Sequence, residues 1–194
     1  MKMNTKTIVG MGLLTAIVIV LQALALNIRF GMFCISLVLV PIIVGAALYG
    51  WQAGAWLGFV FSVVVLFTDA GAFLAINVPG TIVTVIAKGT LAGLVAGLVY
   101  AALSKKTSKL VSTVVAGILA PVVNTGVFLL GCLVFFLPTI SEWAAGAGYE
   151  NAGAFLIFGL VGVNFIVELA INLVLSTVIV QIVNIGKKEI FAEA

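Results

Sequence analysis

Val78–Leu103, with the sequence VPGTIVTVIAKGTLAGLVAGLVYAAL, is a long apolar stretch in which Lys88 is the only charged side chain. A helix needs about 20 mostly apolar residues to cross the hydrocarbon core of a bilayer. Asn77 stands directly before the stretch and Pro79 lies in its first turn, which is typical of a helix start. The stretch therefore predicts a transmembrane helix with one cation inside it.

Five more apolar stretches flank this one on both sides. They are residues 8–26, 32–49, 53–67, 110–137 and 154–186. The first resembles a signal peptide in part, but it is longer than the usual 7–15-residue apolar core of one, so we expect a retained helix. Pro41 predicts a kink in the second stretch. The pattern predicts an all-α integral membrane protein of six transmembrane helices, forming a single domain over residues 1–194.

The composition excludes several other classes of protein. Hydrophobic residues make up 64% of the chain and charged residues 8%, whereas a soluble domain commonly carries about 25% charged residues. Histidine is absent, which removes histidine-based metal sites and catalytic triads. Asp69 is the only aspartate, so a pair of intramembrane aspartates is missing. Neither a phosphate-binding glycine–lysine motif nor an aromatic–basic patch for nucleic acid is present. We expect no enzyme, no metal and no cofactor.

The charges divide between the two sides that six spans would create. The side of the N-terminus receives all the lysines outside the spans, and the other side receives Arg29 with three acidic residues. The lysines are Lys2, Lys6, Lys105, Lys106, Lys109, Lys187 and Lys188, and the acidic residues are Asp69, Glu142 and Glu150. By the positive-inside rule both termini should be cytoplasmic, and residues 27–31, 68–78 and 138–153 should form outward loops.

Polar side chains inside the predicted spans mark a candidate site. A charge near the centre of a bilayer costs roughly 2.5–3.5 kcal/mol, so Lys88 and Glu168 need a partner, a wet cavity or a ligand. Helical spacing puts further polar residues on the same helix faces: Thr81 and Thr84 join Lys88, while Asn164 and Asn172 join Glu168. Together with Asn124, these two stripes predict a pocket reached from outside.

A simpler interpretation remains open at this point. Lys88 and Glu168 could form a buried ion pair, with the amides only tying helices together. Two glycine strips, Gly50-Gly54-Gly58 and Gly89-Gly93-Gly97, have the spacing of close helix contacts and should join the third and fourth helices to neighbours within the chain. The shorter pair Gly12 and Ala16 could serve internal packing or a partner helix.

Several of these segments together resemble a known family. The resemblance is to the S components of energy-coupling factor (ECF) vitamin transporters. It rests on Tyr49-Gly50-Trp51-Gln52-Ala53-Gly54, on Lys88-Gly89-Thr90-Leu91-Ala92-Gly93, on Asn124 after Pro121, and on the segment from Asn164 to Asn172. The resemblance covers nearly the whole chain and includes six helices with internal termini.

The resemblance implies a function for the whole chain. An S component captures a water-soluble vitamin or related micronutrient at the outer face of a prokaryotic cell membrane. It delivers the vitamin inward together with a T component and two ATPase subunits. Substrate contacts would come from Lys88, Asn124, Asn164, Glu168, Asn172, Thr84, Thr81 and Arg29. Gly12 and Ala16 match the family's Ala-x-x-x-Ala docking pattern for the T component, with glycine in place of the first alanine. Riboflavin and pantothenate are the favoured substrates.

Two other classes of function remain as alternatives. A stand-alone secondary transporter or channel could use Lys88 and Glu168 as an ion-linked pair. A structural membrane protein would only pair its internal charges.

Overall fold

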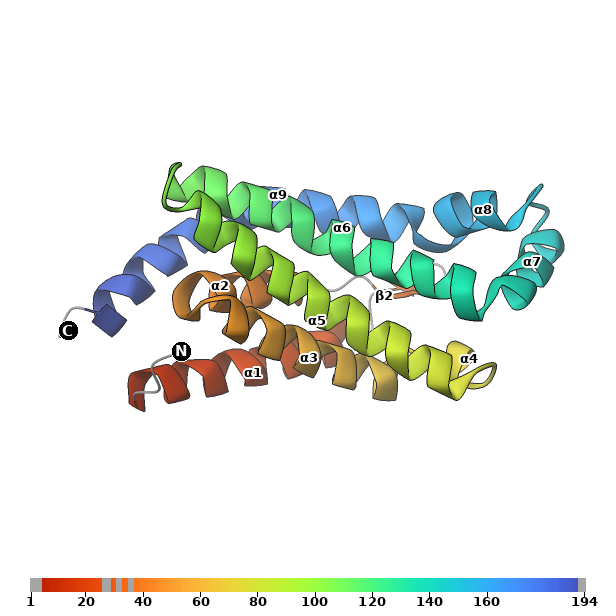
Figure 1. Ribbon diagram of the computed structural model, residues 1–194, viewed down its shortest axis with the longest axis horizontal. Coiled ribbons are helices and arrows are strands. Elements are labelled where there is room, and N and C mark those ends of the chain that lie inside the picture. The colour runs from red at the N-terminus through yellow and green to blue at the C-terminus, as the bar shows by residue number, and fades with distance from the viewer. Residues whose placement is uncertain (1–4, 26–28, 31–32, 35–36, 192–194) are drawn as a thin grey trace.

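The computed structural model describes residues 5–25, 29–30, 33–34 and 37–191, and these residues are almost all helical. A pair of two-residue antiparallel strands, β1 (Arg29–Phe30) and β2 (Phe33–Cys34), is the exception. The helices form an elongated bundle (Figure 1). In chain order they are α1 (Thr5–Ala25), α2 (Leu39–Tyr49), α3 (Trp51–Thr68), α4 (Gly71–Leu74), α5 (Val78–Leu103), α6 (Lys109–Phe135), α7 (Leu137–Gly146), α8 (Ala152–Ala154), the π-helical segment η1 (Phe155–Val161) and α9 (Gly162–Phe191).

Five helical segments are long and apolar enough to cross a membrane: α1, α3, α5, α6 and the continuous run Ala152–Gly186. They match five of the six predicted stretches. Asn77 caps α5 as expected, because its side chain accepts a hydrogen bond from the backbone N–H of Gly80 at 2.9 Å. The chain is therefore an all-helical, multi-pass membrane protein.

The second predicted span is shorter than expected. The helix α2 begins only at Leu39 and has 11 residues, so it rises about 16 Å against a hydrocarbon core of about 30 Å. Pro41 lies in the first turn, where a missing backbone N–H costs nothing, so it starts the helix and the expected kink is wrong. The count of six spans stays a prediction.

Two predicted outer loops contain short helices. The helix α4 lies within residues 68–78, and α7 occupies most of residues 138–153. Pro138 stands in the first turn of α7, and Ile140 and Ala144 on its inner face are buried. Both segments were predicted as loops, and neither helix is long enough to span a membrane.

The glycine strips of α3 and α5 pack against each other. A Cβ atom placed on Gly54 would collide with the carbonyl oxygen of Gly93, and one on Gly89 would lie 2.7 Å from the carbonyl oxygen of Gly58. Only glycine allows the two backbones to come this close. The predicted internal packing is confirmed at these four glycines, and it fixes α5, with Lys88, against α3.

Gly50 does not belong to that seam. A Cβ atom there would meet nothing within 4 Å, and the residue has a φ of 93° in the turn between α2 and α3. Gly50 is needed for this left-handed turn conformation and not for helix contact, which corrects its assignment to the strip. The glycine strip on α5, in contrast, includes its third member, because Gly97 packs on the backbone of Trp51.

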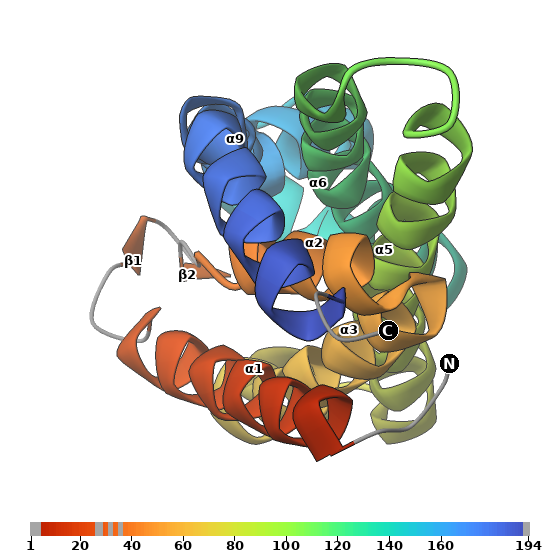
Figure 2. The same ribbon diagram turned by 90° about the vertical axis from the view of Figure 1, so that its left-hand side faces the viewer.

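The two ends of the bundle carry different side chains. The start of α1, the turn between α5 and α6 and the end of α9 lie at the same end, and α4 and α7 lie at the other (Figures 1 and 2). The first end has the exposed Lys105, Lys106 and Lys109, whereas the second has the exposed Glu142 and Glu150. This separation agrees with the predicted orientation, which stays a prediction.

Candidate substrate-binding pocket

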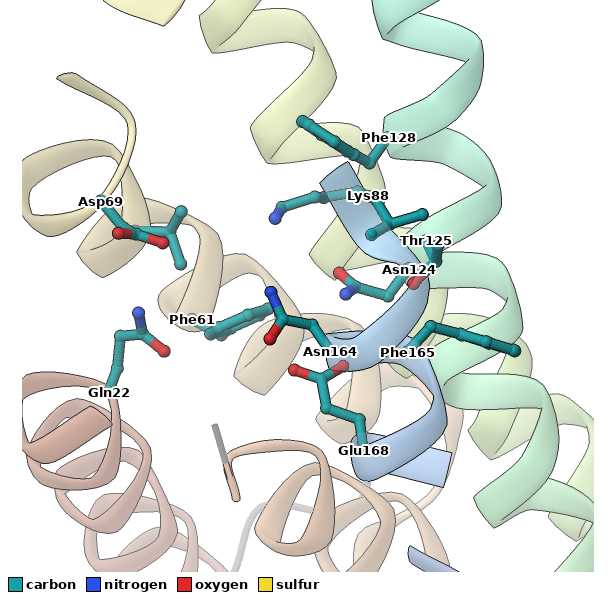
Figure 3. Close-up of a pocket in the computed structure, with 12 residues that line it drawn as sticks. Gln22, Phe61, Asp69, Lys88, Asn124, Thr125, Phe128, Asn164, Phe165 and Glu168 are labelled. Atoms are coloured by element: carbon teal, nitrogen blue, oxygen red, sulfur yellow. The ribbon is translucent and has the colours of Figure 1, made fainter. Parts of the chain in front are cut away.

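A cavity lies between α1, α3, α5, α6 and the continuous run of η1 and α9 (Figure 3). It offers about 70 Å³ to the centres of water-sized molecules, several times the roughly 10–15 Å³ that one buried water needs. Its lining residues belong to α1, α3, α5, α6, the end of η1 and α9, and one of them, Asp69, directly follows α3. They are Gln22, Phe61, Val65, Asp69, Lys88, Asn124, Thr125, Phe128, Val161, Asn164, Phe165 and Glu168.

Lys88 and Glu168 enter this cavity from opposite walls. The ammonium group of Lys88 points into it from α5, and the carboxylate of Glu168 points into it from α9 (Figure 3). The ammonium nitrogen also lies 5.3 Å and 5.9 Å from the ring centroids of Phe128 and Phe61, which is within cation–π range. The two intramembrane charges therefore share one hollow.

Three amide side chains complete the polar wall. Gln22, Asn124 and Asn164 are 2%, 8% and 9% exposed. Their side-chain oxygens accept no hydrogen bond from the described part of the chain. A buried acceptor without a donor costs about 1–3 kcal/mol, so these oxygens suit a solute that donates hydrogen bonds.

The remaining predicted site residues lie elsewhere. Thr81 and Thr84 line a second, smaller cavity that adjoins the first, and the Thr81 hydroxyl donates to the carbonyl oxygen of Asn77 at 2.7 Å. Asn172 lies deeper, where its amide donates to the backbone oxygen of Glu168 at 2.8 Å and its side chain packs near Gly117 of α6. Arg29 belongs to β1, and its side chain lies outside the described residues.

The pocket also contains residues that the sequence analysis did not select. These include the polar Gln22, Asp69 and Thr125 and the aromatic Phe61 and Phe128. Gln22 did carry a signal, because it is one of two polar side chains in residues 8–26, and an amide there is costly in lipid. The aromatic residues could not be distinguished from other apolar residues of α3 and α6.

A π-helical segment directly precedes α9. The segment η1 widens the helix over Phe155–Val161 directly before the pocket-lining Asn164, Phe165 and Glu168. Gly162 fits at its end because a Cβ atom there would lie 2.5 Å from the carbonyl oxygen of Ile157. Such segments often occur at functional sites, since the extra residue in the turn changes which side chains share a face.

No group of three or more metal-binding side chains occurs among residues 5–25, 29–30, 33–34 and 37–191. What the cavity does offer is an ammonium group, two carboxylates, amides and aromatic rings from separate helices. This set can hold a polar solute of small size by hydrogen bonds and ring contacts.

Comparison with known proteins gives one match. The model of a family described as the ECF transporter, substrate-specific component, matches residues 6–180. No curated protein and no solved structure matches the chain.

Proposed function

This chain belongs to the family of substrate-specific components of ECF transporters, and we propose on that basis that it binds a water-soluble vitamin or related micronutrient at the outer face of a prokaryotic cell membrane. In this role it is a transporter subunit that binds its substrate without converting it. It delivers the substrate inward together with a T component and two ATPase subunits.

The observation that carries the proposal is the convergence of polar groups in one cavity. Lys88, Asn124, Asn164 and Glu168 come from three different helices and line the same hollow. Side chains that only tied helices together would have their hydrogen bonds satisfied by neighbouring helices. The amide oxygens of Asn124 and Asn164 instead have no donor within the described chain, which favours a solute as the partner.

The position of the cavity fits capture from outside. Its wall includes Asp69, which stands between α3 and α4, and α4 lies at the outer end of the bundle if the lysine-rich end is cytoplasmic. Riboflavin and pantothenate are the substrates we favour, because both offer several hydroxyl or amide donors to the buried amide oxygens.

Docking of the T component is proposed at Gly12 and Ala16 of α1. Both residues are exposed, and a Cβ atom on Gly12 would meet nothing within 4 Å. A neighbouring helix could therefore approach α1 closely along this face.

Mass spectrometry of the small molecules that co-purify with the detergent-solubilised protein tests the substrate. We expect a water-soluble vitamin in about equimolar amount, bound without chemical change. Pull-down from native membranes should also recover a T component and ATPases. If no small molecule binds and no transporter subunit co-purifies, the proposal is wrong.

The presence of Lys88 and Glu168 in one cavity also suits a secondary transporter that uses these two charges to couple ions. Reconstitution separates the two functions. Proton-dependent uptake by the isolated protein in liposomes would favour the secondary transporter. An S component alone should bind its substrate without accumulating it.

A further inference from the structure

The second cavity adjoins the first and differs from it in character. Four residues line both cavities, namely Val65, Asp69, Lys88 and Phe128. The other side chains of the second cavity are mostly apolar: Ala70, Phe73, Val85 and Phe136 with Thr81 and Thr84. The two hollows are therefore neighbouring compartments on either side of Lys88 and Phe128, one polar and one mainly apolar.

Its size limits what the second compartment can hold. It offers about 20 Å³ to the centres of water-sized molecules, slightly more than a single water requires. Six of its ten lining residues are apolar, so a group placed there contacts mainly hydrocarbon. One or two methyl groups match both the size and the polarity.

The part of the wall around Phe73 is rigid, because several aromatic rings pack against one another there. Phe73 of α4 makes edge-to-face contacts with Phe128, Phe136 and Trp143, at ring-centroid distances of 5.5, 5.0 and 5.7 Å. These rings belong to a buried cluster that joins α4, α6, α7 and η1. Interlocked aromatic rings hold the shape of a cavity better than single flexible chains.

Thr84 provides a second, independent observation. It is 4% exposed, and its hydroxyl has no hydrogen-bond partner within the described part of the chain. A Cβ atom at Gly131 of α6 would collide with the Thr84 side chain, so this threonine packs directly against the glycine. Thr84 is thus one of four polar residues in this wall, with Asp69, Thr81 and Lys88, and the other six lining residues are apolar.

We propose that the second compartment is a subsite for a small methyl-bearing apolar group of the substrate, whose polar part donates hydrogen bonds to Gln22, Asn124 and Asn164 in the first compartment. The inference rests on the proposed function and adds the orientation of the ligand to it. Riboflavin carries two methyl groups on its ring and pantothenate carries two on one carbon, so both belong to this class.

Two probe pairs test the subsite by calorimetry: riboflavin with its analogue lacking both ring methyl groups, and pantothenate with its analogue lacking both methyl groups. For the pair that binds, we expect the methyl-free analogue to bind the unmodified protein about tenfold more weakly, the order expected for two buried methyl groups.

Ala70→Val provides the matching change in the protein, because Ala70 is 4% exposed and lines only the second compartment. It should weaken binding of the methylated probe about tenfold and leave binding of the methyl-free analogue within twofold. Ala72→Val, at an exposed position of the same short helix, is the control and should bind both probes like the unmodified protein.

The outcomes separate the subsite from the function. If one pair binds and Ala70→Val affects both members equally, or affects neither, the subsite is wrong while the transporter function stands. If neither pair binds, the methyl-bearing class is wrong. In that case another vitamin found by mass spectrometry would leave the proposed function intact, and its absence would remove that function too.

Discussion

At the scale of single residues, Glu168 is the side chain whose charge matters most to the proposed binding. It lines the pocket together with Lys88, and its carboxylate points into the cavity from α9. Hydrogen bonds to a charged group contribute about 1.5–3 kcal/mol, which is roughly 10- to 100-fold in affinity. The size of the side chain contributes less than its charge.

Glu168→Gln should therefore weaken vitamin binding at least tenfold while leaving the folded yield unchanged. Glutamine keeps the shape of the side chain and removes its charge. Titration calorimetry with the co-purified vitamin measures the loss, and Glu142→Gln on the exposed surface of α7 is the control. An unaltered affinity would show that Glu168 does not face the substrate.

Asn124 and Asn172 provide a contrast between two buried amides. Both side-chain oxygens lack a donor in the described chain, but Asn124 lines the pocket, whereas the amide of Asn172 donates to the backbone of Glu168 and Asn172 does not line the pocket. Asn124→Leu should lower affinity about tenfold with little effect on thermal unfolding. Asn172→Leu should lower stability by about 1 kcal/mol and bind normally. Calorimetry and thermal unfolding of both variants measure this, and equal loss of binding in the two would contradict the assignment.

At the scale of the helices, the contact between α3 and α5 determines where Lys88 lies. Gly54→Ala would place a Cβ atom against the carbonyl oxygen of Gly93 and 2.9 Å from the Cβ atom of Ala46. The two helices would have to separate, which should cost about 1–3 kcal/mol. Gly126→Ala in α6 meets nothing within 4 Å and should stabilise the helix by about 0.5–1 kcal/mol. Denaturant unfolding in detergent compares them, and a stable Gly54→Ala variant would contradict the seam.

The apolar stretches could be predicted from sequence because lipid imposes one strong rule on them. Backbone groups in hydrocarbon must bond within the segment, so long apolar runs become helices. The same rule does not apply to α4 and α7, which are too short to span and are held by buried rings such as Phe73. Likewise, from sequence alone Pro41 is compatible with a kink inside a helix or with the start of one. The two cases are distinguished only by where the first turn of α2 lies.

The pocket could be predicted only in part. Helical spacing correctly grouped Asn164 with Glu168, since the two are one turn apart on α9. It also grouped Asn172 with them, although a face two turns long crosses from the pocket into the contact with α6. Gln22 was missed because the contribution of α1 depends on how this helix packs on the bundle, and spacing within one helix carries no such information.

At the scale of the whole molecule, the distribution of charge predicts which end faces the cytoplasm. The exposed Lys105 and Glu142 lie at opposite ends of the bundle. In a background with Cys34 and Cys132 replaced by serine and alanine, Glu142→Cys should react with a membrane-impermeant maleimide on intact cells. Lys105→Cys should react only after the cells are opened. The reverse pattern would invert the topology and place the pocket towards the cytoplasm.

Assembly with the rest of the transporter depends on the outer face of α1. The structure leaves Gly12 and Ala16 exposed there, while α1 is tied to α3 by a hydrogen bond from the indole of Trp56 to Thr15 at 3.2 Å. Gly12 and Ala16 do not line the pocket to which Gln22 of the same helix contributes, so docking and binding can be altered separately.

Ala16→Leu should spare vitamin binding and reduce recovery of the T component at least fivefold, because a bulky side chain keeps a partner helix from approaching α1. Ala170→Leu is the matched control, since Ala170 is exposed on α9, where the same added volume meets only lipid. Tagged proteins purified from membranes that contain the complete transporter give the ratio of subunits, and calorimetry gives the affinity. Normal recovery of the T component with Ala16→Leu would remove this face as the docking site, and equal losses in both variants would point to a general effect of added bulk.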